Sequence, residues 1–194
     1  DESALACSTA VEALAKGWKN DPNTLPWLKE RAQTDENAVV RSAATHELAQ
    51  GWKDDLETLP LLKERAKTDE NGMVRRNAVK ELAKGWKDDL ETLPFLKERA
   101  QIDEDKNVRR VALQELAKGW KTDNDLLAFW LDRALNDPFE RKLPESLSGK
   151  HLEMMELIEQ VEPMPRRVAL KILVQQYPKH PQTREILAGY AKSG

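Results

Sequence analysis

Three stretches of the chain carry valine, alanine and leucine at intervals of four residues. The sets are Val40, Ala44 and Leu48, then Val74, Ala78 and Leu82, then Val108, Ala112 and Leu116. A spacing of four keeps side chains on one face of an α-helix, so each stretch is predicted to be an amphipathic helix. We call these stretches the B helices and expect the middle one to span residues 71–84.

A second kind of helix is predicted after each B helix. Leu93, Leu96 and Ala100 lie at positions i, i+3 and i+7, which gives one buried stripe to a helix over residues 92–101. Thr92 is the predicted N-cap of this A helix, and Pro94 falls in its first turn, where a missing N–H costs little. The links between A and B helices are too short for anything but antiparallel neighbours.

The tripeptide Gly-Trp-Lys follows the B helices with a strict period. It begins at residues 17, 51, 85 and 119, so successive copies lie 34 residues apart. Gly85 is expected to take the left-handed conformation that closes a helix, with Trp86 packed over the last turn. A period between about 20 and 50 residues indicates a solenoid, in which each unit buries its apolar face only against its neighbours.

In three units an aspartate is followed six residues later by an arginine. The pairs are Asp35 and Arg41, Asp69 and Arg75, and Asp103 and Arg109. They resemble the HEAT repeat, in which such residues form a ladder of hydrogen bonds between stacked units. A planar guanidinium can serve carboxylates and helix-end carbonyls at once. Cys7 stands at the arginine position of the first unit, which weakens the first interface or marks a cut one.

The fuller unit is similar to the HEAT-type arrays found C-terminal to the NACHT ATPase module of bacterial STAND proteins. The motifs GWKDD, TLP and LKERA occur together and in this order. The resemblance implies an all-α, right-handed α-solenoid of antiparallel helical hairpins that serves as the recognition segment of a signalling or defence protein. An NTPase domain would lie upstream in the same parent chain. No G-x-x-x-x-G-K-[ST] loop occurs in the sequence itself, so ATP hydrolysis by that route is not expected.

The chain is predicted to be one solenoid of five units, covering residues 1–34, 35–68, 69–102, 103–136 and 137–194. It begins in mid-repeat, because residues 1–4 align with residues 35–38. Residues 164–170 match residues 107–113 at an offset of 57, which exceeds the period by 23. An insertion over residues 138–163 is therefore predicted inside the last unit. Its apolar positions Met154, Leu157, Ile158 and Val161 predict a short helix that either caps the array or docks a partner.

The charge and hydropathy of the chain argue against some classes of function. The 194 residues include 34 acidic and 31 basic side chains, which gives a net charge of -3 and a pI of about 5.8. No long-range field therefore attracts the whole chain to nucleic acid or anionic lipid. The mean hydropathy of -0.70 and the lack of a long apolar run predict no membrane span. The single cysteine and the absence of a leader segment favour the cytoplasm.

Candidate catalytic residues are sparse. His46, His151 and His180 are scattered over different units, so neither a metal site nor a cofactor site is predicted. Paired carboxylates such as Asp54 and Asp55 recur in the connections, which favours helix capping because a catalytic site is needed only once. We therefore expect a protein that is not an enzyme.

Binding information should lie where the units differ. The B-helix positions beside the core stripe change from mixed to basic along the chain: Ser8, Glu12 and Lys16, then Ser42, His46 and Gln50, then Arg76, Lys80 and Lys84, then Arg110, Gln114 and Lys118, then Arg167, Lys171 and Gln175. In HEAT arrays the B helices line the concave face, so the resemblance implies a partner-binding surface at Arg76, Lys80, Lys84, Arg110, Gln114, Lys118, Arg167 and Lys171, suited to an acidic protein. The alternative is a solvated face balanced by Glu81 and Glu115.

Three functions follow, of which a non-enzymatic scaffold for protein interaction or ligand sensing is the first. The second is nucleic-acid binding, which the basic stripe favours and the net charge opposes. The third is enzymatic, by analogy with HEAT-like subunits of bilin lyases.

Overall fold

The computed structural model describes residues 2–121, 123, 125–138 and 164–192, and every regular element within them is an α-helix. The predicted insertion lies outside these residues, apart from Pro138. The B helices are α1 (Glu2–Gly17), α3 (Ala38–Gly51), α5 (Gly72–Gly85), α7 (Lys106–Gly119) and α10 (Pro165–Gln176). The A helices are α2 (Thr24–Thr34), α4 (Thr58–Thr68), α6 (Thr92–Ile102), α8 (Leu126–Asn136) and α11 (Pro181–Lys192).

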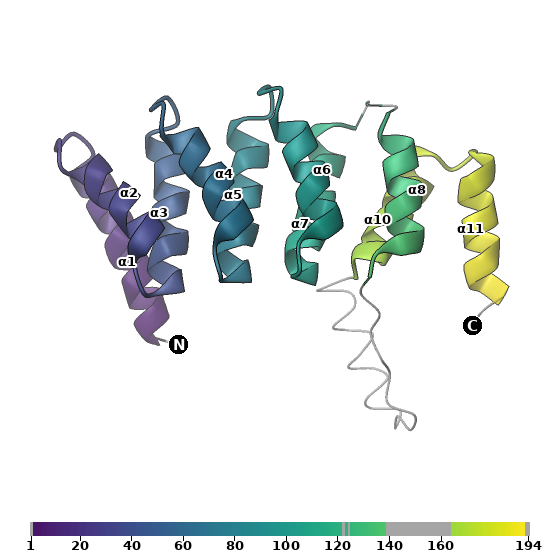
Figure 1. The fold of residues 1–194 in the computed structure, drawn as a ribbon, viewed down its shortest axis with the longest axis horizontal. Coiled ribbons are helices and arrows are strands. Elements are labelled where there is room, and N and C mark those ends of the chain that lie inside the picture. The colour runs from purple at the N-terminus through teal and green to yellow at the C-terminus, as the bar shows by residue number, and fades with distance from the viewer. Residues whose placement is uncertain (1, 122, 124, 139–163, 193–194) are drawn as a thin grey trace, which may run out of the picture.

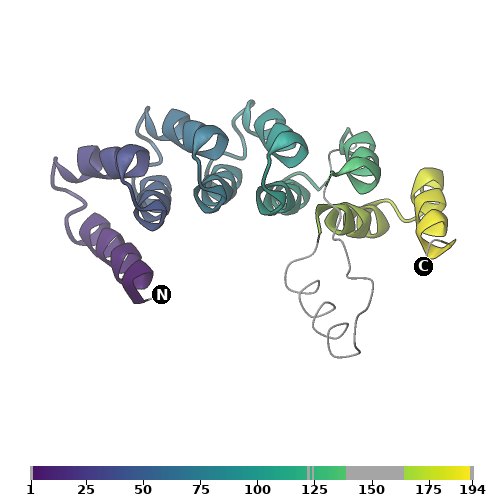
Figure 2. The same ribbon diagram turned by 60° about the horizontal axis from the view of Figure 1, so that its bottom comes forward.

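The helices form two rows along the long axis of the molecule (Figure 1). The B helices lie side by side in an inner row, and α2, α4, α6 and α8 form an outer row above them (Figure 2). Each of α2, α4, α6 and α8 packs mainly against the B helix that follows it in the chain and forms a hairpin with it, and neighbouring B helices pack against one another. The prediction of an all-α solenoid is confirmed.

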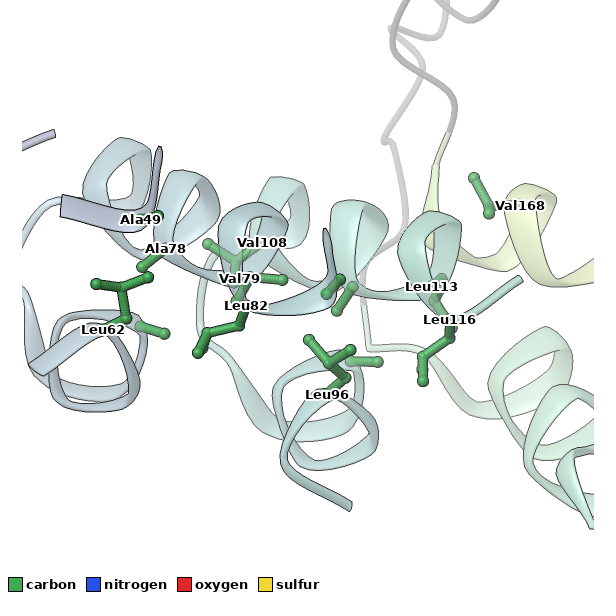
Figure 3. Packing of buried hydrophobic residues seen from close by; sticks show 14 of the residues in the cluster. Ala49, Leu62, Ala78, Val79, Leu82, Leu96, Val108, Leu113, Leu116 and Val168 are labelled. Atoms are coloured by element: carbon green, nitrogen blue, oxygen red, sulfur yellow. The ribbon is translucent and has the colours of Figure 1, made fainter. Parts of the chain in front are cut away.

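The core runs without interruption between the two rows. Each of the three central hairpins contributes one leucine and one alanine from each helix, all fully buried: Leu28, Ala32, Ala44, Leu48, Leu62, Ala66, Ala78, Leu82, Leu96, Ala100, Ala112 and Leu116. Figure 3 labels Leu62, Ala78, Leu82, Leu96 and Leu116 of this set, whose side chains point into the space between the helices. Burying one leucine contributes about 1.5 to 3 kcal/mol. Because Val79 and Leu113 fill the space between neighbouring B helices, no unit completes its core alone.

The end of α5 differs from the predicted geometry. Gly85 is the last helical residue, and no residue in the described ranges, glycine included, has a positive φ, so the predicted left-handed glycine is wrong. Trp86 ends the helix instead, with φ at -127° and ψ at 39°, and its N–H donates to the carbonyl of Leu82. An L-residue adopts this conformation without strain, so the turn does not require glycine.

The start of α6 also corrects a prediction. Its N-cap is Glu91 and not Thr92, which is the first helical residue and is buried. The hydroxyl of Thr92 donates to Oδ1 of Asp89 at 3.3 Å, and the same oxygen accepts the N–H of Glu91 at 3.1 Å. Asp89 therefore organises the turn before the helix, and Pro94 lies in the first turn, where no intrahelical N–H bond is lost.

Arg75 connects two neighbouring units. Within its own turn, Nη1 donates to the backbone carbonyls of Asp69 at 2.7 Å and Glu70 at 3.3 Å. Towards the next unit, Nε and Nη2 donate to the two carboxylate oxygens of Asp103 at 3.1 and 3.0 Å. Both side chains are almost fully buried. Each such rung therefore joins the arginine of one unit to the aspartate of the following unit.

The same rung recurs on both sides of Arg75. Arg41 donates to both carboxylate oxygens of Asp69 at 2.9 Å, and Arg109 donates to those of Asp137 at 2.9 and 3.0 Å. Burial raises the pKa of Asp69, but the hydrogen bonds from Arg41 and from the N–H of Asn71 outweigh it and hold that pKa below its usual value. The stability that this carboxylate supplies is therefore present at neutral pH and lost as the pH falls through its lowered pKa.

The ladder changes at both of its ends. On α1, Cys7 occupies the arginine position, and the carboxylate of Asp35 retains 18% of its exposure instead of being sealed by a neighbouring unit. At the other end, Arg166 of α10 donates from Nε to the carbonyl of Asp137 at 2.8 Å. Arg166 thus keeps the contact with its own turn across the interruption of the period.

Two further sets of contacts repeat between units, and neither was predicted from the sequence. On the outer row, Nζ of Lys29 lies 2.7 Å from both Asp55 and Glu57, and Nζ of Lys63 lies 3.2 and 2.8 Å from Asp89 and Glu91. In the connections, Lys19 and Lys53 lie over the rings of Trp52 and Trp86, 6.0 and 5.9 Å from the centroids. A cation over an exposed ring contributes about 0.5 to 1 kcal/mol. These contacts give structural roles to the recurring Gly-Trp-Lys and Leu-Lys-Glu-Arg-Ala motifs.

Replacing Gly85 with alanine tests the helix end directly. A Cβ at this position meets no atom within 4 Å, and the residue is already helical. We expect Gly85→Ala to raise the free energy of unfolding by about 0.5 to 1 kcal/mol, because alanine restricts the unfolded chain and favours the helix. Urea unfolding followed by circular dichroism measures the change, and a loss of stability would indicate a left-handed glycine after all.

Replacing Arg75 with alanine tests the ladder. The substitution leaves the carboxylate of Asp103 buried without its bidentate partner, so we expect a loss of about 3 to 5 kcal/mol in the free energy of unfolding. Arg76→Ala is the matched control, because the neighbouring arginine belongs to no rung. A loss below about 1 kcal/mol, as expected for a solvated ion pair, would contradict the structural role of the ladder.

Candidate functional site

The inner row is hollowed into a groove of about 570 Å³ that spans α1, α3, α5 and α7. Five of the residues predicted for partner binding line it together: Arg76, Lys80, Arg110, Gln114 and Lys118. They share the groove with side chains from the first two B helices, among them Ser8, Glu12, Ser42 and His46. The groove is therefore built from the same face of four successive helices, at the positions where the repeats differ in sequence.

The remaining predicted residues lie outside this groove. Lys84, on the last turn of α5, points its ammonium towards Glu81 at 3.9 Å and is not among the lining residues. Arg167 and Lys171 line a second groove of about 930 Å³ between α7 and α10, which Gln114 and Lys118 also border. The structure thus divides the predicted basic surface into two neighbouring hollows.

Cations in the first groove differ in their internal partners. Lys118 pairs with Glu115 of its own helix at 2.7 Å, and Arg110 donates to Oδ1 of Asn107 at 3.4 Å. Arg76 and Lys80 have no ion pair with any residue that the structure describes. Two positive charges on α5 are therefore available to an anionic group in the groove.

A row of buried glutamates runs along the same three B helices. Glu47, Glu81 and Glu115 lie 34 residues apart and are only 7%, 2% and 7% exposed. Glu115 and Glu81 lie 2.7 and 3.9 Å from Lys118 and Lys84, so they balance nearby cations as the alternative reading expects, but both carboxylates are buried and not solvated. Their regular recurrence is visible in the sequence, whereas their burial is not.

Glu81 has two donors from the preceding unit. Nε2 of Gln50 lies 2.8 Å from one carboxylate oxygen, and Nδ1 of His46 lies 3.2 Å from the other. Glu115 instead accepts a hydrogen bond from Nζ of Lys118 on its own helix. Both carboxylates are therefore hydrogen-bonded, as buried charges ordinarily are.

Glu47 lacks such partners. The positions on α1 that correspond to His46 and Gln50 are Glu12 and Lys16, and these two side chains pair with each other. No hydrogen bond or ion pair joins the Glu47 carboxylate to a described residue. Burial raises the pKa of Glu47, nearby charges on His46 and Lys16 partly oppose the shift, and the negative charges of Glu12 and Glu81 reinforce it. The α1 and α3 end of the groove thus holds an uncompensated carboxylate.

Metal ligands do not assemble in the described ranges, where no group of three or more His, Cys, Asp or Glu side chains could hold a metal ion. His46 lies in the groove and His180 precedes α11, whereas His151 falls outside the described residues. None of the helices within these ranges has the length and apolar character needed to cross a membrane.

The stacked hairpins define the class of α-solenoids. The sequence model of the HEAT repeats matches residues 25–117 and 59–141, which together cover more than half of the chain. The protein belongs to the HEAT-repeat family, whose members are commonly scaffolds for protein interaction. Neither a search of curated proteins nor a search of solved structures found a match.

Replacing Glu47 with glutamine tests whether its charge is uncompensated. A carboxyl whose pKa is raised in the folded state favours folding when protonated, so stability falls as the pH rises through the unfolded-state pKa towards the folded-state pKa. We expect Glu47→Gln to be more stable than the wild type at pH 7 and the difference to shrink towards pH 4. Urea unfolding at both pH values measures it, with the exposed, outer-row Glu64→Gln as control. Equal or lower stability at pH 7 would show that Glu47 has a compensating partner.

Proposed function

We propose that this chain is a non-enzymatic scaffold that binds an acidic segment of a protein partner in the groove across α1, α3, α5 and α7. The observation that carries the proposal is the pair of cations on α5, Arg76 and Lys80, which line the groove without an ion pair to any residue that the structure describes. Charges that are already held by a neighbour contribute little to a new partner. These two are free to do so, and Arg76 can receive a carboxylate through two parallel hydrogen bonds.

The groove suits a chain segment better than a compact small molecule. It is open and elongated over four helices, and its polar side chains are spread along it in steps of one repeat. A segment lying across the B helices would meet one set of side chains per unit, so specificity would follow from the differences between units. Glu12 on α1 is acidic, whereas most of the charged lining residues on α5 and α7 are basic, so the two ends of such a segment would have different surroundings.

The parent protein is also part of the proposal. The order of the GWKDD, TLP and LKERA motifs supports a place in a NACHT-type signalling or defence NTPase, with this array as its recognition segment. Partner binding in the groove would then be the input to that NTPase. A phosphate-binding G-x-x-x-x-G-K-[ST] loop encoded upstream of Asp1 is the expected finding in the parent gene, and a parent without one would remove the link.

Charge reversal in the groove tests the binding role. We expect a fluorescein-labelled peptide with a block of six glutamates to bind the wild type in fluorescence anisotropy, with an affinity that falls as salt is added. The triple variant Arg76→Glu, Lys80→Glu and Arg110→Glu should lose binding by more than about tenfold, the equivalent of 1.4 kcal/mol.

A matched triple variant distinguishes the effect of charge in the groove from the effect of the net charge of the protein. Lys67→Glu, Lys121→Glu and Lys179→Glu alter the net charge equally at exposed lysines that border neither groove. This control should bind the acidic peptide nearly as well as the wild type. Equal losses in both triple variants would contradict a groove site. Tighter binding of single-stranded RNA or duplex DNA than of the peptide, abolished by the groove variant alone, would favour nucleic-acid binding instead.

A further inference from the structure

The groove is electrically polar along its length. On α5 and α7 it is lined by Arg76, Lys80, Arg110 and Lys118, with only Glu115 opposing them. On α1 and α3 its charged lining consists of Glu12 and Glu47, beside His46. A bound segment that is uniformly acidic would place negative charge against Glu12 and Glu47, and like charges in a partly desolvated site repel.

Of the three buried glutamates, Glu47 is the one that receives no hydrogen bond from a described side chain. Glu81 receives Gln50 and His46, and Glu115 receives Lys118, whereas Glu47 faces the Glu12 and Lys16 pair and is bonded to neither. It is more than nine-tenths buried and lines the groove. An ionised carboxylate in this setting favours a cation that can enter from the groove, because no described side chain bonds to it and the nearby ammonium of Lys16 is held by Glu12.

We propose that the groove recognises a segment of mixed charge, whose acidic residues lie against Arg76 and Lys80 and whose lysine or arginine lies against Glu47. This inference rests on the proposed function and adds to it the sign of charge at the other end of the ligand. The uncompensated glutamate selects against a uniformly acidic segment, and the two free cations select against a uniformly basic one. The pair of opposite subsites also orients the segment, with its basic end on α1 and α3.

Two labelled peptides of equal length test the inference on the whole chain. One carries six glutamates, a Gly-Ser linker and three lysines, and the other has glutamines in place of the lysines. We expect the lysine peptide to bind the wild type roughly three- to tenfold tighter in fluorescence anisotropy at low salt. Glu47→Gln should abolish that advantage and leave the affinity for the glutamine peptide unchanged or improved. Arg76→Gln should weaken both peptides.

Glu64→Gln is the matched control, because it removes the same charge from the outer row, and it should retain the preference for lysine. Equal binding of the two peptides by the wild type would overturn the inference while leaving the proposed acidic-segment function intact. A lysine advantage that survives Glu47→Gln would likewise overturn it, since the cation would then bind elsewhere. Binding of neither peptide by the wild type would refute the proposed function, and the inference with it.

Discussion

The buried bidentate pair between the arginine of one unit and the aspartate of the next is the interaction on which this solenoid depends. One guanidinium binds the turn of its own unit through two carbonyls and the turn of the following unit through a carboxylate. The same carboxylate accepts the N–H two residues later, as in Asp103 and Asp105, so it shapes its own turn as well. Because both geometries are directional, each rung sets the offset between neighbouring B helices. The groove exists because that offset repeats.

Apolar packing could not set this offset alone. The buried faces consist mainly of alanine and leucine at a spacing of four, and the burial of apolar surface is non-directional. A buried ion pair tolerates no slip of one helix along its neighbour, because a displaced arginine would leave an unpaired carboxylate in the core. Leucine and alanine therefore supply the hydrophobic driving force for stacking, and the arginine–aspartate rungs fix the register between neighbouring B helices.

The 34-residue period made most of the helices predictable from the sequence. The predictions that failed concern helix ends, which were inferred from the capping preferences of single residues. The helices expected over residues 71–84 and 92–101 span Gly72–Gly85 and Thr92–Ile102. Gly85 and Thr92 were misjudged because glycine and threonine often cap isolated helices, whereas here Trp86 ends its helix beneath Lys53 and Asp89 shapes the next turn while it pairs with Lys63, both lysines belonging to the preceding unit. In the groove, the basic positions were visible in the sequence, but the pairing of each charge was not. Whether a carboxylate such as Glu81 receives a hydrogen bond depends on side chains that lie 31 and 35 residues earlier in the chain.

A repeat protein separates stability from recognition by the degree to which a position repeats. Residues that recur in the three central units, such as the ladder arginines, are each needed at every interface and so cannot vary to suit a ligand. The B-helix positions beside the core carry no such demand, and their differences leave some charges satisfied and others not. Glu81 and Glu47 occupy equivalent sites, but the preceding B helix presents His46 and Gln50 to Glu81 and presents Glu12 and Lys16 to Glu47. Glu81 also has Lys84 of its own helix at 3.9 Å, where Glu47 has Gln50. Departures from the repeat at these few positions thus leave Glu47 without the bonded partners that Glu81 has.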